Sequence, residues 1–135
     1  MKSADALIRI AKHQIDLVRR RLAAVETQLS ETNARLAGLD SEEMRERAFC
    51  LANPDMTTSL SRFLQGAALR RASLAASRAA LLEQMRALHL DLQHAFEEQK
   101  KIELLEEKRK LRVRQEQARI ETATLDEVAG RRRRT

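Results

Sequence analysis

The side chains that most often carry catalysis or bind metals are few and widely spaced in this sequence. The three histidines are His13, His89 and His94, and the last two are five residues apart. On a helix that spacing turns the two rings to different faces, whereas a metal-binding pair needs a spacing of four. There is no glycine-rich phosphate loop and no triad motif. We therefore expect no catalytic site, no metal, no cofactor and no enzyme activity.

The single cysteine and the N-terminus bear on the compartment. Cys50 cannot form an internal disulfide, which excludes a small secreted domain stapled by disulfides. Its simplest interpretation is a small, half-buried apolar residue. No stretch approaches the ~20 apolar residues of a membrane span, and residues 1–5 lack the apolar core of a signal peptide. We expect a water-soluble protein of the cytosol.

The composition favours long helices over a compact globular core. Of the 135 residues, 43% are hydrophobic and 34% are charged, whereas only 2% are aromatic. Compact cores normally use aromatic side chains as bulky filler, and this mixture is typical of coiled coils. The length allows one domain, and we expect residues 1–135 to form a single coiled-coil domain.

The clearest pattern is a row of mostly apolar residues in the first part of the chain, spaced alternately by three and four. A mean spacing of 3.5 residues keeps one narrow seam of a helix turned toward a partner helix. We call this row the first seam; it comprises Ile8, Ala11, Ile15, Val18, Leu22, Val25, Leu29, Thr32, Leu36 and Leu39. The charged residues between them are expected to be solvated. The pattern predicts a helix over about residues 4–37.

Helix-breaking residues follow the first seam. Gly38 can take the left-handed conformation that ends helices, and Asp40 and Glu43 have the spacing of a capping box. Pro54 cannot continue a helix, but it can start one after Asn53. We therefore predict a bend, with a short helix, over about residues 38–58, where the chain reverses.

A second helix is predicted over about residues 59–129, followed by a basic tail at 130–135. Its apolar row, the second seam, comprises Leu74, Leu81, Met85, Leu88, Leu92, Ala95 and Ile102, and is interrupted by Arg78 and Gln99. After Ile102 the pattern decays. Two sparse rows continue, one of Leu104, Leu111, Ala118 and Leu125 at intervals of seven, the other of Val113 and Ile120.

These patterns predict an all-α fold in which two long helices form an antiparallel coiled-coil hairpin. A reversal near Pro54 places residue 8 opposite roughly residue 100, and residue 39 opposite roughly residue 69. Roughly 30 residues after Ile102 then have no partner, and this C-terminal helical overhang could reach ~45 Å. A parallel coiled coil between two chains is the alternative, but it explains neither the break nor the late loss of pattern.

Most of the net charge of +6 lies at the C-terminal end. Residues 100–135 contain twelve basic and seven acidic residues. By contrast, residues 1–53 have a net charge of +1, and residues 54–99 have a net charge of zero. The terminal arginines Arg131–Arg134 could neutralise phosphates, but they have no aromatic platform beside them. We favour a frayed terminus. For the arginines, the alternatives are docking to an acidic protein and nucleic-acid binding. For the whole protein, the alternative is a self-pairing scaffold, whereas a hairpin is expected to be monomeric at micromolar concentration.

Two of the three aromatic residues, Phe49 and Phe63, fall near the bend. The simpler interpretation is that they plug the end of the hairpin. The functional interpretation is an exposed apolar patch for a partner, because aromatic side chains often anchor interfaces.

Three features of the chain are specific when taken together. The first is its size and two-helix plan. The second is the stretch Arg62–Gly66, followed by Leu69 and a long helix. The third is the C-terminal stretch Leu125–Arg132, in which Leu-Asp-Glu is followed by small and basic residues. In these features the chain resembles the FliJ family, the small stalk proteins of the flagellar type III export apparatus, and it is more distantly similar to their injectisome counterparts. It departs from the family in lacking Tyr and in its Arg-only terminus.

The resemblance implies protein partners and no small-molecule substrate. Such proteins enter the hexameric ring of the export ATPase, connect it to the export gate at the inner membrane, and bind export chaperones. The gate contact would then fall at Phe63 and Leu64. The contact with the ring would fall on the free ends of the two helices. These include the overhang, with Leu125, Asp126, Glu127, Ala129, Arg131 and Arg132.

Overall fold

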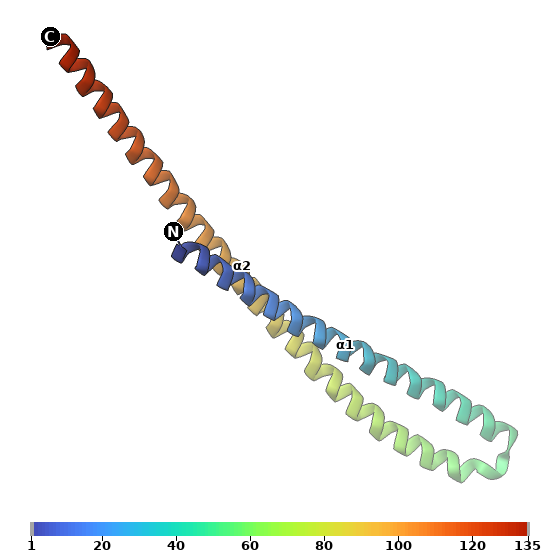
Figure 1. The fold of residues 1–135 in the computed structure, drawn as a ribbon. Coiled ribbons are helices and arrows are strands. Elements are labelled where there is room, and N and C mark those ends of the chain that lie inside the picture. Colours follow the sequence, from blue (N-terminus) through green and yellow to red (C-terminus); the bar gives the residue numbers. More distant parts are fainter. Residues whose placement is uncertain (1, 135) are drawn as a thin grey trace. The chain divides into compact units, whose positions relative to one another are not determined.

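The fold consists almost entirely of two long helices, as predicted. The computed structural model describes residues 2–134, and the described part contains no strand. Helix α1 runs over Lys2–Ala52, a short 3-10 helix η1 over Pro54–Met56, and helix α2 over Thr57–Arg134. Figure 1 shows α1 and α2 joined by the single tight bend at η1. The all-α hairpin is therefore confirmed.

The contacts divide the chain into two compact units. The bend unit comprises residues 16–93, which hold the later part of α1, the bend and the first part of α2. The terminal unit comprises residues 1–15 and 94–135, which bring the first turns of α1 together with the C-terminal part of α2.

In the bend unit the two helices are antiparallel, as their cross-links show. Arg78 donates a hydrogen bond to the side chain of Asn33 at 2.9 Å, and Arg71 donates one to Asp40 at 2.8 Å. Arg71 therefore lies opposite Asp40, where the sequence placed residue 68. The register is shifted because α1 continues to Ala52 and the chain reverses later than expected.

All ten residues of the first seam are buried or half-buried. Ile15, at 3% exposure, is the most covered, and Leu22 and Leu39 are 7% and 6% exposed. The seven residues of the second seam are all half-buried. Leu69, which the sequence placed opposite residue 39, is instead 75% exposed, and Ala67 is buried in its place at 1%. The hydrophobic effect of this narrow stripe is what holds two otherwise charged helices together.

The bend, residues 53–56, is fixed by hydrogen bonds to residues close by in the sequence. Asn53 donates its backbone N–H to the carbonyl of Phe49, and its side-chain amide donates to the same oxygen. Pro54 opens η1 at the first helical position, where its missing N–H costs nothing. Thr57 then donates its hydroxyl to the Pro54 carbonyl at 2.7 Å. The backbone of Asn53 is not helical, which is what a residue before proline prefers.

The predicted helix boundaries around the bend are wrong. Helix α1 does not end near residue 37 but continues through Gly38 to Ala52, and α2 begins at Thr57. Gly38 has no positive φ. Asp40 and Glu43, which have the spacing of a capping box, bind Arg71 across the hairpin instead. A mid-helix glycine costs only about 1 kcal/mol, and the packing of Leu36 and Leu39 on either side outweighs that cost.

The end of α2 also differs from the prediction. The helix passes through Gly130, again without a positive φ, and includes Arg131–Arg134, which the sequence assigned to a tail. In the terminal unit the seam also extends beyond Ile102, because Glu106 is buried and Arg109 is half-buried. The overhang, which we define as residues 110–134, is therefore about 25 residues long and could span ~37 Å as a helix.

Candidate partner-binding surfaces

No chemistry-bearing cluster stands out in the part of the chain that the structure describes. Over those residues there is no group of three or more His, Cys, Asp or Glu side chains placed to hold a metal ion. His13, His89 and His94 are all exposed, and His94 lies 3.6 Å from the carboxylate of Glu97 on the same helix. Among the described helices, none is apolar enough over a sufficient length to cross a membrane.

The overhang is a long stretch of helix that the fold leaves uncovered. Every residue from Lys110 to Ala129 is exposed. Within this stretch are apolar side chains that a folded chain normally covers, with Leu111 at 51%, Ile120 at 54% and Leu125 at 69% exposure. An exposed apolar row on a helix is the signature of a surface that another molecule covers.

The C-terminal residues singled out by the sequence all lie on this overhang. Leu125, Asp126, Glu127, Ala129, Arg131 and Arg132 are exposed. The structure brings two of them together, because Arg131 donates a hydrogen bond to the Glu127 carboxylate at 3.0 Å, one helical turn away. Such exposed pairs support the helix by a few tenths of a kcal/mol and leave both side chains accessible.

The beginning of the overhang is strongly basic. Residues 108–119 contain six basic side chains and one acidic side chain, Glu116. Glu116 is held by Arg119, one turn further on. Arg109, Lys110 and Arg114 surround Val113 and form with it a shallow apolar hollow with a cationic rim. This part of the helix suits a partner that offers acidic side chains around an apolar contact.

The bend forms a second uncovered surface, and the sequence identified it only in part. Phe63 and Leu64, the predicted gate contact, are half-buried near the start of α2. The more exposed apolar side chains lie on α1 and η1: Leu51 at 85%, Met44 at 72%, Phe49 at 49% and Met56 at 42%. We call these four residues, with Phe63 and Leu64, the bend surface.

Leu51, Met44 and Met56 were not singled out from the sequence, although a signal was present. Between Arg47 and Arg62 the chain contains a single charged residue, Asp55. A stretch with so little charge at the bend of a hairpin is unusual in a protein with 34% charged residues, and it indicates an apolar surface there. The methionines add flexible, adaptable side chains of the kind found at binding surfaces.

Cys50, the neighbour of this surface, behaves as the small apolar residue that the sequence suggested. It is 7% exposed, and its thiol donates a weak hydrogen bond to the Met56 carbonyl at 3.5 Å. The contact joins the last turn of α1 to η1 on the buried side of the bend.

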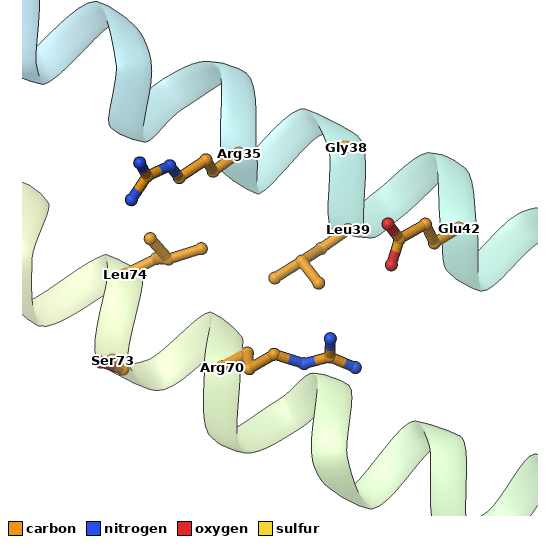
Figure 2. A pocket seen from close by; sticks show the side chains of 7 residues that line it. All are labelled: Arg35, Gly38, Leu39, Glu42, Arg70, Ser73 and Leu74. Atoms are coloured by element: carbon orange, nitrogen blue, oxygen red, sulfur yellow. The ribbon is translucent and has the colours of Figure 1, made fainter.

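An open groove of about 450 Å³ lies between the two helices of the bend unit. Figure 2 shows Leu39 and Leu74 pointing into it from opposite helices. Arg35 from α1 and Arg70 from α2 reach along its rim, and Glu42 lies at its far end. Gly38 contributes no side chain, which helps to keep the groove open beside Leu39.

Next to the groove, a charged layer interrupts the seam. Arg71 donates to Asp40 and to Glu43, both at 2.8 Å, and Arg47 donates to Glu43 at 3.0 Å. The hydrogen bond from Arg71 lowers the pKa of Glu43, the bond from Arg47 adds to the effect, and burial opposes it. The same bonds, that to Glu43 first, raise the pKa of Arg71. Glu43 and Arg71 are therefore both charged at neutral pH.

A similar charged layer ends the seam in the terminal unit. Glu106 is 9% exposed and accepts two hydrogen bonds from Arg109, at 2.7 and 3.1 Å. These bonds lower the pKa of Glu106 against the effect of burial. The bonds to Glu106 raise the pKa of Arg109, and the carboxylate of Asp5 adds to this. Beyond this layer, α2 has no cover within the chain from Lys110 to Ala129.

Together, a coiled-coil hairpin, an uncovered apolar bend and an uncovered basic helix define an elongated-helix, all-α protein with exposed apolar and basic side chains. Comparison with known proteins gives the family. The chain matches the family described as Flagellar FliJ protein over residues 1–135. The protein thus belongs to the FliJ family, which connects it with flagellar protein export.

Curated relatives agree with this assignment. The Flagellar FliJ protein of Caulobacter vibrioides strain NA1000 / CB15N is 27% identical over 131 residues, which cover 97% of this chain and 94% of the relative. The Flagellar FliJ protein of Caulobacter vibrioides strain ATCC 19089 / CIP 103742 / CB 15 matches with the same identity and coverage. No solved structure matches. Family membership confirms the resemblance drawn from the sequence.

Proposed function

We propose that this protein is a central stalk of the flagellar type III export apparatus and has no catalytic activity of its own. In this role the overhang binds inside the hexameric ring of the export ATPase. The bend surface contacts the cytoplasmic part of the membrane export gate, so the protein works at the cytoplasmic face of the inner membrane. The observation that carries the proposal is the overhang, an exposed helix that the fold of the chain does not use.

The dimensions and charge of the overhang suit a ring. A single helix is only about 10–12 Å across with its side chains, so it can enter a narrow pore. The basic residues at positions 108–114 favour a lumen of opposite sign. Exposed charge pairs are worth only about 0–1 kcal/mol each, so such contacts can break and reform as the ring changes state.

The bend surface suits a different kind of contact. It has one charge between Arg47 and Arg62, and its exposed side chains are Leu, Met and Phe. Burial of such side chains is the main source of affinity in protein interfaces, and aromatic residues often contribute most. We assign the export gate to this end. Export chaperones are further partners, and we expect them to bind exposed helical faces outside the seam.

The proposal is tested by disabling the overhang and the bend surface one at a time. Binding of the full chain to the purified export ATPase and to the gate's cytoplasmic domain is measured at low salt. A chain that stops at Lys110 should lose the ATPase but keep the gate. A Leu51→Asp variant should do the reverse, and it should fold normally because Leu51 is 85% exposed.

Two outcomes would overturn this assignment. Failure of the full chain to bind the ATPase at low salt would remove the stalk function. Loss of both partners in both variants would show that the two ends do not act separately.

A further inference from the structure

The overhang carries two apolar rows on opposite sides of one helix. The front row continues the seam spacing beyond Arg109 with Val113, Ile120 and Ala123. The back row consists of Leu104, Leu111, Ala118 and Leu125 at intervals of seven. Successive residues of an α-helix are about 100° apart, so Leu111 and Val113 point to nearly opposite sides. The two rows therefore need different occupants.

Where α2 is paired with α1, the back row faces away from α1. Leu104 lies in the paired part of the terminal unit, between half-buried Ile102 and buried Glu106, and is still 45% exposed. Leu111 is 51% exposed and Leu125 is 69% exposed. A row with a strict period of seven is the pattern that a second helix covers in a coiled coil. The fold itself makes no use of this row.

The charges beside the back row indicate which charges a second helix needs in order to pair with it. Residues 108–114 contain five basic and no acidic side chains, whereas residues 120–127 contain three acidic and no basic side chains. Neither Arg114 nor Glu121 forms an ion pair within the part of the chain that the structure describes. A fitting partner helix is acidic opposite residues 108–114 and basic opposite residues 120–127.

The same stretch of a second copy, run antiparallel, meets this requirement. With Ala118 opposite Ala118, Leu111 lies opposite Leu125 of the other copy. Arg114 then lies beside the other copy's Glu121, and the pair occurs twice by symmetry. The small alanine at the centre lets the two helices approach closely. A parallel arrangement would place basic side chains on basic ones, which is unfavourable.

We propose that two copies of this protein pair antiparallel through the back row of their overhangs, centred on Ala118. The pair covers Leu125, which we also place in the ring contact, and it is two helices wide, so a paired overhang and one inside the ATPase ring exclude each other. The pairing rests on the back row alone and not on the proposed function. Only three leucine and alanine layers form the contact. We therefore expect a weak dimer, with a Kd on the order of 100 µM, and a monomer at low micromolar concentration.

The charge pattern gives the first test, by sedimentation velocity of the full chain from 5 to 500 µM. Arg114→Glu and Glu121→Arg should each weaken the dimer by about tenfold, because each places like charges together at two symmetric positions. Combining the two changes reverses both pairs and should restore wild-type association. A chain that stays monomeric at 500 µM, or a double variant as weak as the single ones, would overturn the proposal.

Disulfide trapping tests the direction and the face, in a Cys50→Ser background. A mixture of Leu111→Cys and Leu125→Cys chains should form a mixed disulfide, whereas neither chain should cross-link efficiently to itself. Ala118→Cys should cross-link to itself across the symmetry axis, and Ala123→Cys, on the front row, is the matched control and should not. Self-cross-linking at position 111 equal to the mixed product would show a parallel pair and contradict the proposal.

Discussion

Arg71 forms two ion pairs between the two helices of the bend unit. It holds Asp40 and Glu43 of α1 at the point where the apolar seam gives way to charge. A charged side chain at a seam position lowers stability relative to an apolar one but fixes which residues lie opposite each other. A shift of one turn would leave Arg71 without its carboxylates, so this layer specifies the register.

The pH dependence of stability follows from the charge on Glu43. Its folded pKa lies below the usual value of 4.5, so the folded state binds its proton later than the unfolded state as pH falls. The stabilisation is therefore fully present above about pH 4.5 and is lost as pH falls through the folded pKa. Thermal unfolding measured by circular dichroism should show Glu43→Gln melting below wild type at pH 7, with the gap closing toward pH 3. A gap that is constant with pH would contradict the assignment.

Two leucines that look alike in the sequence provide a test of the register. Leu22 is 7% exposed in the first seam, whereas Leu69 is 75% exposed, although the sequence placed Leu69 opposite residue 39. Leu22→Ala should lower the free energy of unfolding by about 2–3 kcal/mol, because it empties a buried site. Leu69→Ala is the control and should change it by less than about 0.5 kcal/mol. Urea unfolding measures both. Equal effects would mean that the register is the one predicted from the sequence.

At the scale of the helices, the sequence predicted the seams well and the ends poorly. The alternation of three and four is long-range information repeated over ten residues, and every residue of the first seam is covered. The breaks at Gly38 and Gly130 were inferred from single residues whose local preference is worth about 1 kcal/mol. Packing on either side of Gly38 outweighs this preference. At Gly130 the ion pair of Glu127 with Arg131 spans the glycine and offsets part of it.

The candidate surfaces were predictable to the same degree. The overhang follows from counting residues past the reversal, so its position emerged from the sequence, although the seam proved to extend to Arg109. The apolar bend emerged only in part, through Phe49 and Phe63, because the exposure of Leu51 depends on α1 continuing to Ala52. A predicted helix end near residue 37 hid the fact that these side chains line one helical end.

Replacing the glycines inside the helices by alanine is expected to stabilise the protein. A Cβ built at Gly38 or at Gly66 meets no atom within 4 Å, and both residues have helical backbone angles. Gly38→Ala and Gly66→Ala should each raise the free energy of unfolding by about 0.5–1 kcal/mol, since alanine has less conformational freedom to lose. Denaturant titration measures the change. Destabilisation by Gly38→Ala would indicate that a helix break there is important after all.

At the scale of the whole molecule, the buried seam and the uncovered overhang are carried by different parts of the chain. Among the residues that the structure describes, every buried one lies between Ala11 and Glu106. Residues 110–129 are exposed throughout, and their helix is supported by pairs such as Arg119 with Glu116. An isolated helix of this length is marginal in water even with favourable pairs. The overhang is therefore helical at little cost and free to be ordered by what it binds.

A chain that stops at Lys110 should consequently unfold at the same temperature as the full chain, within about 2 °C, because no buried contact is removed. The full chain should show an additional gradual loss of helix signal at 222 nm before the main transition, from the overhang alone, and high salt should enlarge it by screening the helical ion pairs. The measurement is made at about 10 µM, where the weak dimer is not populated. A drop of many degrees on truncation would mean that the overhang is part of the folded core, and its use as a free binding arm would have to be abandoned.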